Sequence, residues 1–406
     1  MRAGRWWTAA VAVAGLLATA TVPACGVLHR SARPLASAPP PASAGPPAAA
    51  ASCSAPDRAN PVFSHTSGSH LIDTRGQVMV PDGITVFGLA LKDWQAQEAQ
   101  DRRQIKAAIT TWCTSYVRLM VAPAGLLSAR PDDAAYLAAV RSEVQLALSY
   151  GNDVILCAQT ERWPGSQPAD GPTQQTVQFW RVLAPIYRHN PRVWFDVFNE
   201  PRLKTGNVWG TWQHGGTVAG QHYLGMQQLV TAVRAAAGDT NLIIVEGPLA
   251  AQTLSGVPSH PITGANVAYA VHPYGQTSVA GWNSHFGQVA STVPVLADEW
   301  ATSGLRKHGS CGPDPAIWVP RFFAYLHARQ IGLGAWGLVP GVMVTNTASF
   351  TPTRLGSSFT CLHGRGAAIA SKNAASNGGR AVPQAQGVGQ LVQHYFRSAH
   401  PASARD

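Results

Sequence analysis

Charged side chains are scarce in this chain, since only 12% of its 406 residues are Asp, Glu, Lys or Arg. Basic residues still outnumber acidic ones and give a net charge of +10, a value that suggests a nucleic-acid-binding protein. The excess lies at the two ends, because residues 1–58 and 364–406 each contain five basic residues and one acidic residue. The long segment between them is close to neutral and has no basic patch interleaved with aromatic residues. This distribution argues against nucleic acid as a partner.

Cysteine is also rare, and the common metal and nucleotide motifs are missing. The six cysteines form no CxxC pair and the chain contains no HExxH sequence, so we predict no metal site. No glycine-rich phosphate loop follows the first predicted strand, which argues against a doubly wound nucleotide-binding sheet. We therefore expect an activity that requires no cofactor.

The first 24 residues have the pattern of a signal peptide. Arg2 and Arg5 precede an apolar run over 6–22, and small residues follow it. The run is short for a membrane-spanning helix. The sequence VPAC, which ends at Cys25, also loosely resembles a bacterial lipobox, so a lipid anchor on Cys25 and plain secretion are both open. In either case we expect a secreted or envelope-anchored protein.

A linker is predicted over residues 25–58. Within it, residues 34–52 are all Ala, Pro, Ser or Gly except Leu35. Such a segment cannot bury enough apolar surface to offset the entropy lost on ordering, so it serves as a spacer. Residues 59–398 then form one domain, which we expect to be monomeric.

Export favours disulfide bonds among the cysteines. Cys157 lies inside an apolar run and is the best candidate for a buried free thiol. Two pairings remain as hypotheses: Cys311 with Cys361, and Cys53 with Cys113, the second of which would tether the N-terminal segment.

Short apolar runs alternate with longer helical patterns from about residue 60 onward. Continuous rather than alternating apolar runs indicate strands that are covered on both faces, as in a parallel sheet. Eight such alternations predict a (β/α)₈ TIM barrel. The expected strands are 84–89, 115–121, 153–158, 193–198, 241–246, 266–271, 293–298 and 331–336. The expected helices are 99–112, 131–150, 174–188, 223–237, 316–329 and 387–397.

Two of these strands lead into a glutamate. The sequence VWFDVFNEP contains Glu200, and VPVLADEW contains Glu299. Active sites of such barrels lie at the C-terminal ends of the strands. A retaining glycosidase needs two carboxyl groups about 5–5.5 Å apart, one to attack the sugar and one to protonate the leaving oxygen. The pair therefore predicts a retaining glycoside hydrolase.

Other polar and aromatic residues recur at the same ends of the predicted strands. They are Arg118, Gln159, Asn199, His272, Tyr274 and Trp336. Together with the two glutamates, these residues resemble glycoside hydrolase family 5, the cellulase-like family of clan A, over about residues 70–396. The resemblance implies that Glu200, in Asn-Glu-Pro, is the acid/base and that Glu299 is the nucleophile.

The resemblance also implies supporting roles. Arg118 would orient the nucleophile, His272 and Tyr274 would flank both carboxylates, and Trp336 would form the floor of the sugar subsite. Independently of the resemblance, indole faces can stack on sugar rings, so Trp209, Trp212, Trp282 and Trp300 are each candidates either for sugar platforms or for core packing.

The expected electrostatics follow from these neighbours. Arg118 should keep Glu299 ionised, and the charge of Glu299 should raise the pKa of Glu200. Asn199 can donate a hydrogen bond to the sugar 2-hydroxyl, a contact that strengthens in the transition state. Glu246 is expected to form a structural salt bridge.

Two positions qualify the resemblance. Gln159 stands where the family usually has a histidine, which places the chain off the main cellulase branch and leaves its substrate open. Asp298 directly precedes the nucleophile, so strand alternation predicts that its side chain points to the opposite side.

These inferences predict an exported enzyme that cleaves a β-linked glucan or related β-glycan, with a polysaccharide or oligosaccharide as its partner. A β-mannanase or an exo-β-glycosidase is the alternative within the enzyme class. A non-catalytic, envelope-anchored glycan-binding lipoprotein is the alternative outside it, and the presence of both glutamates argues against it.

Overall fold

A computed structural model describes residues 53, 64–73, 75–127, 132–159, 170–301, 315–340, 342–354 and 388–399. The predicted signal peptide, Cys25, almost all of the linker, and the pairing of Cys311 with Cys361 lie outside these residues and stay predictions. Among the described helices, none is both long and apolar enough to span a membrane.

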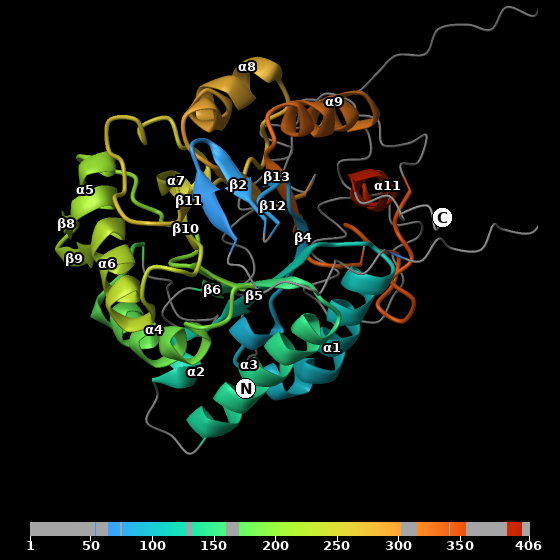
Figure 1. The fold of residues 1–406 in the computed structure, drawn as a ribbon, viewed down its shortest axis with the longest axis horizontal. Helices are drawn as coiled ribbons and strands as arrows, with labels where there is room; N and C mark the ends of the chain where they lie inside the picture. Colours follow the sequence, from blue (N-terminus) through green and yellow to red (C-terminus); the bar gives the residue numbers. More distant parts are fainter. Residues whose placement is uncertain are drawn as a thin grey trace, which may run out of the picture.

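Eight parallel strands close into a barrel at the centre of the molecule, and helices surround it (Figure 1). The predicted (β/α)₈ barrel is thus confirmed. In order around the barrel, the strands are β4 (Asp82–Val86), β5 (Tyr116–Val121), β6 (Asp153–Ala158), β7 (Val193–Asp196), β10 (Ile243–Glu246), β11 (Val267–Ala270), β12 (Val295–Trp300) and β13 (Gly332–Ala335). The first strand lies slightly earlier than predicted, because Gly88–Ala90 form the short 3₁₀ helix η2.

Burial explains why the strands could be recognised. Every residue of β4, β5, β7, β10, β11, β12 and β13 is buried, since one face packs inside the barrel and the other against the helices. Each fully buried aliphatic side chain contributes about 1.5–3 kcal/mol of transfer free energy. Continuous apolar runs are the result.

The six predicted helices are also present. They are α1 (Trp94–Thr110), α3 (Asp132–Ser149), α4 (Gln174–Tyr187), α6 (Met226–Ala237), α9 (Pro315–Ala328) and α11 (Gly389–Ala399). Local signals set some of their ends. The Thr173 side chain caps α4 by accepting a hydrogen bond from the Gln175 N–H at 3.1 Å. Helix α6 ends at Gly238, whose φ of +80° lies in the left-handed region.

Several short elements were not predicted. An antiparallel sheet of β1 (His65–Ser67), β2 (His70–Ile72) and β3 (Val78–Met79) lies across one end of the barrel (Figure 1). Leu71 of this sheet packs in one cluster with Tyr116, Ile155 and Trp194, which come from the early part of three barrel strands. The small sheet therefore closes the N-terminal end of the barrel and leaves the other end for a site.

The remaining short elements lie in the connections. They are α2 (Pro123–Leu126), α5 (Val208–His214), β8 (Gly215–Val218), β9 (Gln221–Leu224), α7 (Pro248–Ala251), α8 (Val279–Trp282), η3 (Asn283–Gly287) and η4 (Val289–Ser291). Strands β8 and β9 form a hairpin, so helix α6 begins after residue 224 rather than at residue 223.

Two cysteine predictions are confirmed. Cys53 and Cys113 form a disulfide, which ties the N-terminal segment to the turn after α1. Cys157 is a free thiol buried in β6.

Candidate active site

The Arg118 guanidinium is the centre of a buried polar cluster at the C-terminal end of the barrel. It donates to Asp196 Oδ2 from Nε at 3.0 Å and from NH2 at 2.8 Å. The same nitrogen, Nη2, also lies 2.8 Å from Asn199 Oδ1 and 2.7 Å from Glu246 Oε1, so these three oxygens share its two N–H groups. NH1 donates to Glu299 Oε2 at 3.0 Å, as predicted. One side chain on β5 thus connects the ends of β7, β10 and β12.

Glu299 is held from both of its oxygens. Besides the contact with Arg118, its Oε1 accepts a hydrogen bond from the Tyr274 hydroxyl at 3.1 Å, which confirms the expected contact. Only 6% of the Glu299 side chain is exposed. Burial raises the pKa of Glu299 to about 7; the charge of Glu200 also raises it, while His272 and Arg118 act in the opposite direction.

Glu200 follows β7 and adopts a left-handed conformation, with φ of +50°. Its N–H donates to Glu246 Oε2 at 2.6 Å. Its carboxyl Oε1 lies 3.2 Å from His272 Nδ1, and Oε2 accepts a hydrogen bond from Arg202 at 3.3 Å. Burial raises the pKa of Glu200, but the hydrogen bonds and charges of His272 and Arg202 outweigh burial and leave that pKa lowered.

In the free site the directions of these two shifts differ from the expected ones, and the two carboxyl groups interact closely enough to titrate as a pair. The prediction weighed only Glu299 and Arg118. In the structure Arg118 is shared among four carboxyl groups, while Arg202 adds positive charge beside Glu200 alone. Positive charge is thus spread thinly on the Glu299 side and concentrated on the Glu200 side.

His272 lies between the two glutamates, with Nδ1 also 3.7 Å from Glu299 Oε1. One carboxylate oxygen from each glutamate and a ring nitrogen of His272 all lie within 4.8 Å of one another. Burial lowers the pKa of His272, but the charges of Glu246 and Glu299 outweigh it and hold that pKa well above its usual range. The predicted position of His272 beside both carboxyl groups is confirmed.

Three groups of side chains among the described residues bring potential metal ligands within 4.8 Å of one another. They are Cys157–Asp196–Glu246, Glu200–His272–Glu299 and Glu246–His272–Asp298. Each group contains either a carboxylate paired with Arg118 or His272 itself. The guanidinium and the imidazole thus already supply positive charge where a cation would bind.

Gln159 and Trp336 lie at the ends of their strands as predicted. Gln159 follows β6, and its Oε1 is buried without a hydrogen-bond partner in the described part of the chain. Trp336 follows β13 and is partly exposed, with one face stacked on Phe87 at a ring-centroid distance of 5.3 Å. The amide oxygen of Gln159 and the second face of the Trp336 ring can thus each contact a further partner.

The prediction for Asp298 is wrong. Its Oδ2 lies 3.4 Å from Arg118 Nε and its Oδ1 lies 3.3 Å from His272 Nε2, so it faces the same cluster as Glu299. The pairing of β12 with β13 shifts register between Ala297 and Trp300. Such an irregularity breaks strict alternation and allows two consecutive side chains to reach the barrel interior.

Asp196 was missed, and Glu246 was given only a structural role. The predicted salt bridge of Glu246 exists, but its partner is Arg118 and it also contacts Glu200. Period-two alternation was the available signal. Asp196 lies two positions after Trp194, and Glu246 lies two positions after Ile244. Both of these apolar residues pack in the interior of the barrel, so alternation directs the two acidic side chains to the same side.

The tryptophan predictions divide by burial. Trp212, Trp282 and Trp300 are at most 1% exposed, so of the two alternatives they pack in the core and do not form sugar platforms. Trp209 is partly exposed and stacks on His260 with centroids 6.1 Å apart.

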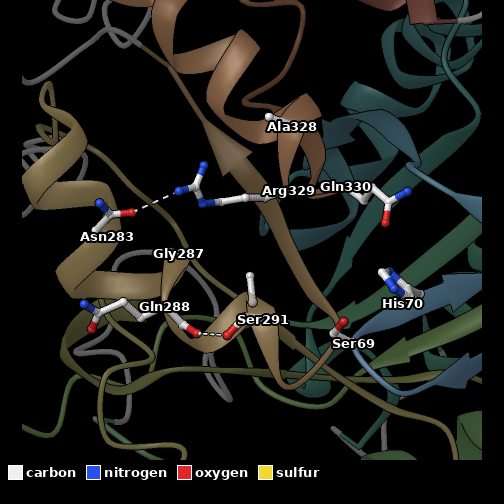
Figure 2. A pocket seen from close by; sticks show the side chains of 10 residues that line it. Ser69, His70, Asn283, Gly287, Gln288, Ser291, Ala328, Arg329 and Gln330 are labelled. Carbon is white, nitrogen blue, oxygen red and sulfur yellow. Dashed lines mark hydrogen bonds between the residues drawn. The ribbon is translucent and has the colours of Figure 1, made fainter.

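A surface cavity of about 570 Å³ lies elsewhere (Figure 2). It is lined by residues from the β1–β2 turn, from η3 and η4, and from the end of α9; Asn283 and Arg329 form a hydrogen bond of 3.4 Å there. These segments precede strands β12 and β13, so the cavity lies toward the N-terminal end of the barrel, away from Glu200 and Glu299.

Comparison with known proteins agrees with this geometry. The family model "Cellulase (glycosyl hydrolase family 5)" matches residues 73–340. An endoglucanase from Halalkalibacter akibai is 25% identical over 312 residues, which is 71% of this chain. The match spans 36% of that endoglucanase, so the chain accounts for about a third of its length.

Solved structures support the fold. A β-glucanase from Saccharophagus degradans superposes with a TM-score of 0.58 at 21% identity, over 78% of this chain and 93% of that one. The same β-glucanase in complex with cellotetraose gives 0.58 at 20% identity, with the same coverage. The catalytic domain of an endoglucanase from Xanthomonas campestris pv. campestris gives 0.57 at 21% identity, over 74% of this chain and 99% of that one.

Proposed function

Because the chain belongs to glycosyl hydrolase family 5, we propose that it is a glycosidase and cleaves a β-linked glucan by double displacement with retention of configuration. The observation that carries this proposal is the closeness of the two glutamates. A carboxylate oxygen of Glu200 and one of Glu299 lie within 4.8 Å of each other. Retaining enzymes hold their carboxyl groups about 5–5.5 Å apart, whereas inverting enzymes need about 6.5–9.5 Å to admit a water molecule.

Glu299 acts as the nucleophile in this proposal. Arg118 and Tyr274 each donate to one of its oxygens, so the attacking carboxylate is oriented before substrate arrives. Glu200 protonates the departing oxygen and then removes a proton from the water that releases the sugar. Asn199 Oδ1 accepts from Arg118, which leaves the amide N–H groups to donate to the sugar.

In the free site burial raises the pKa of Glu299 to about 7, whereas the contacts of Glu200 with His272 and Arg202 leave its pKa lowered. The reactive form needs an ionised Glu299 and a protonated Glu200. A sugar that excludes water from Glu200, whose side chain is 20% exposed, disfavours the ionised form of that carboxyl and raises its pKa. Substrate binding is therefore expected to help set the reactive protonation state.

Two features support a β-glucan as the substrate, and one leaves an alternative. The chain is similar to an endoglucanase and to a β-glucanase solved with cellotetraose. Trp336 and Trp209 offer aromatic faces of the kind on which pyranose rings stack. Gln159 replaces a charged group with a neutral amide, so a β-mannan or an exo-acting mode stays the alternative. We also propose that the protein acts as a monomer and is exported, either anchored by a lipid on Cys25 or plainly secreted.

The test combines substrate range with stereochemistry. We expect the wild-type protein to release sugar from β-1,4-glucan, and NMR of the first product formed to show the β-anomer. Glu299→Gln and Glu200→Gln should each lower kcat by about a hundredfold or more. Glu98→Gln, the same change on α1 outside the cluster, should leave activity unchanged. An α-anomer as first product, or equal sugar release by the wild type and Glu299→Gln, refutes the proposal.

A panel containing β-1,4-glucan, β-mannan and aryl β-glycosides separates the substrate alternatives. Faster cleavage of β-mannan than of β-glucan overturns the substrate assignment while leaving the mechanism intact. Mass spectrometry of the mature N-terminus decides between lipidation of Cys25 and plain secretion.

A further inference from the structure

Glu246 contacts the groups that hold both catalytic glutamates. It ends β10 and is fully buried. Its Oε1 accepts from Arg118 NH2 at 2.7 Å, and its Oε2 accepts from the Glu200 N–H at 2.6 Å. Its backbone carbonyl accepts from the Trp212 indole N–H at 2.8 Å. The side chain is thus fixed in the barrel between the guanidinium that orients Glu299 and the peptide that carries Glu200.

The peptide of Glu200 needs such support. A φ of +50° lies in the left-handed region, which is unfavourable for a residue other than glycine. Such a conformation persists only where its surroundings hold it. In the described part of the chain, the Glu200 N–H donates to Glu246 and to no other group. The backbone conformation also sets the direction in which the Glu200 side chain leaves the chain.

We propose that Glu246 is a positioning residue for the acid/base: its Oε2 holds the Glu200 peptide in the left-handed conformation that directs the Glu200 carboxyl toward His272 and Glu299, while its Oε1 holds Arg118. The inference rests on the proposed role of Glu200 as acid/base. Glu246 acts through these neighbours, because a fully buried side chain does not reach the sugar.

Glutamine at this position separates the two contacts. A carboxyl offers two oxygen acceptors in either protonation state, whereas an amide offers one. The single oxygen should stay with Arg118, because a hydrogen bond from a charged donor is the stronger one. The amide nitrogen then faces the Glu200 N–H, and two donors in contact repel. Arg118 keeps its bond to Glu299, so Glu246→Gln should disturb Glu200 selectively.

The dependence of kcat/KM on the leaving group of the substrate reports on proton donation by Glu200. Bond cleavage in a dinitrophenyl β-cellobioside needs little proton donation, whereas cleavage of a phenyl β-cellobioside depends on it. The ratio kcat/KM follows the first chemical step for both. We expect Glu246→Gln to lower kcat/KM about tenfold or more on the phenyl substrate and by no more than about twofold on the dinitrophenyl one.

Two controls make the result specific. Glu200→Gln should show the same leaving-group dependence with a larger loss on the phenyl substrate. Asp82→Asn removes another fully buried carboxyl, at the start of β4, and should change both substrates equally. A second variant, Glu246→Asp, keeps a carboxyl group but shortens the side chain away from the Glu200 N–H, and should repeat the pattern if Glu246→Gln does not fold.

The possible results distinguish the positioning role of Glu246 from the acid/base role of Glu200. Equal losses on the two substrates in both Glu246 variants, with a normal dependence in Glu200→Gln, overturn the positioning role alone. No leaving-group dependence in Glu200→Gln overturns the proposed role of Glu200 itself.

Discussion

Asp82 offers a sharp test of how burial sets protonation in this barrel. Its side chain is fully buried at the start of β4, where Oδ1 accepts a hydrogen bond from the Leu333 N–H at 3.1 Å. Burial raises the pKa of Asp82 to about 8, and the hydrogen bond from Leu333 only partly opposes this. The substitution Asp82→Asn retains an oxygen for that bond but cannot ionise.

The sign follows from proton binding. Between the pKa of the unfolded chain, about 3.9, and the folded value of about 8, the folded protein binds more protons at Asp82 than the unfolded chain does. This group therefore stabilises the fold less and less as the pH rises through that window. The difference between the two pKa values corresponds to up to roughly 6 kcal/mol of unfolding free energy. The variant should gain this amount relative to the wild type between pH 4 and pH 9.

Denaturant unfolding followed by tryptophan fluorescence measures this difference at pH 5, 7 and 9. Asp239→Asn is the control, because 78% of its side chain is exposed and its replacement should give a flat difference across the range. An Asp82→Asn difference that is equally flat contradicts the reasoning, since it means that the buried carboxyl has the same pKa in both states.

Three further predictions concern the site and the disulfide. Tyr274→Phe removes the donor 3.1 Å from Glu299 Oε1 and should lower kcat/KM about tenfold or more, measured on aryl β-cellobiosides, with binding of product little changed. Arg202→Gln removes positive charge that helps to keep the pKa of Glu200 low, so that pKa should rise. The acidic limb of the pH profile of kcat/KM should therefore move to higher pH, and an unmoved limb contradicts the assignment. Cys113→Ser opens a loop of 60 residues and should lower the free energy of unfolding by about 4 kcal/mol, which a denaturant titration detects.

Much of the barrel could be predicted because its strands are buried on both faces. The same reasoning could not find β1, β2 and β3, which have two or three residues each and include polar side chains. Their stability comes from pairing with one another and from Leu71, which packs against the barrel interior. Such contacts between distant residues leave no periodic pattern in a segment so short.

The candidate site divides in the same way. Glu200 and Glu299 were visible because each follows an apolar run that is almost free of charge. That Asp298 and Glu299 both face inward was not visible, because two consecutive inward side chains depend on an irregular pairing between β12 and β13 that local sequence does not encode. The lowered pKa of Glu200 depends first on His272, which follows a different strand and meets that carboxyl only in the folded chain, and then on Arg202.

Shared partners make the cluster a single electrostatic unit. Arg118 contacts four carboxyl groups, and His272 lies near a different set of four that overlaps with the first. Five carboxyl groups thus compete for two cations inside the barrel. Burial raises the pKa of Glu246 to about 8, because the positive charges that it shares with the other carboxyl groups only partly oppose burial. Removing one member redistributes protons among the rest, so single substitutions here should not add. The role of Glu246 is therefore best measured as a coupling energy with Glu200, by comparing the double variant with the two single ones.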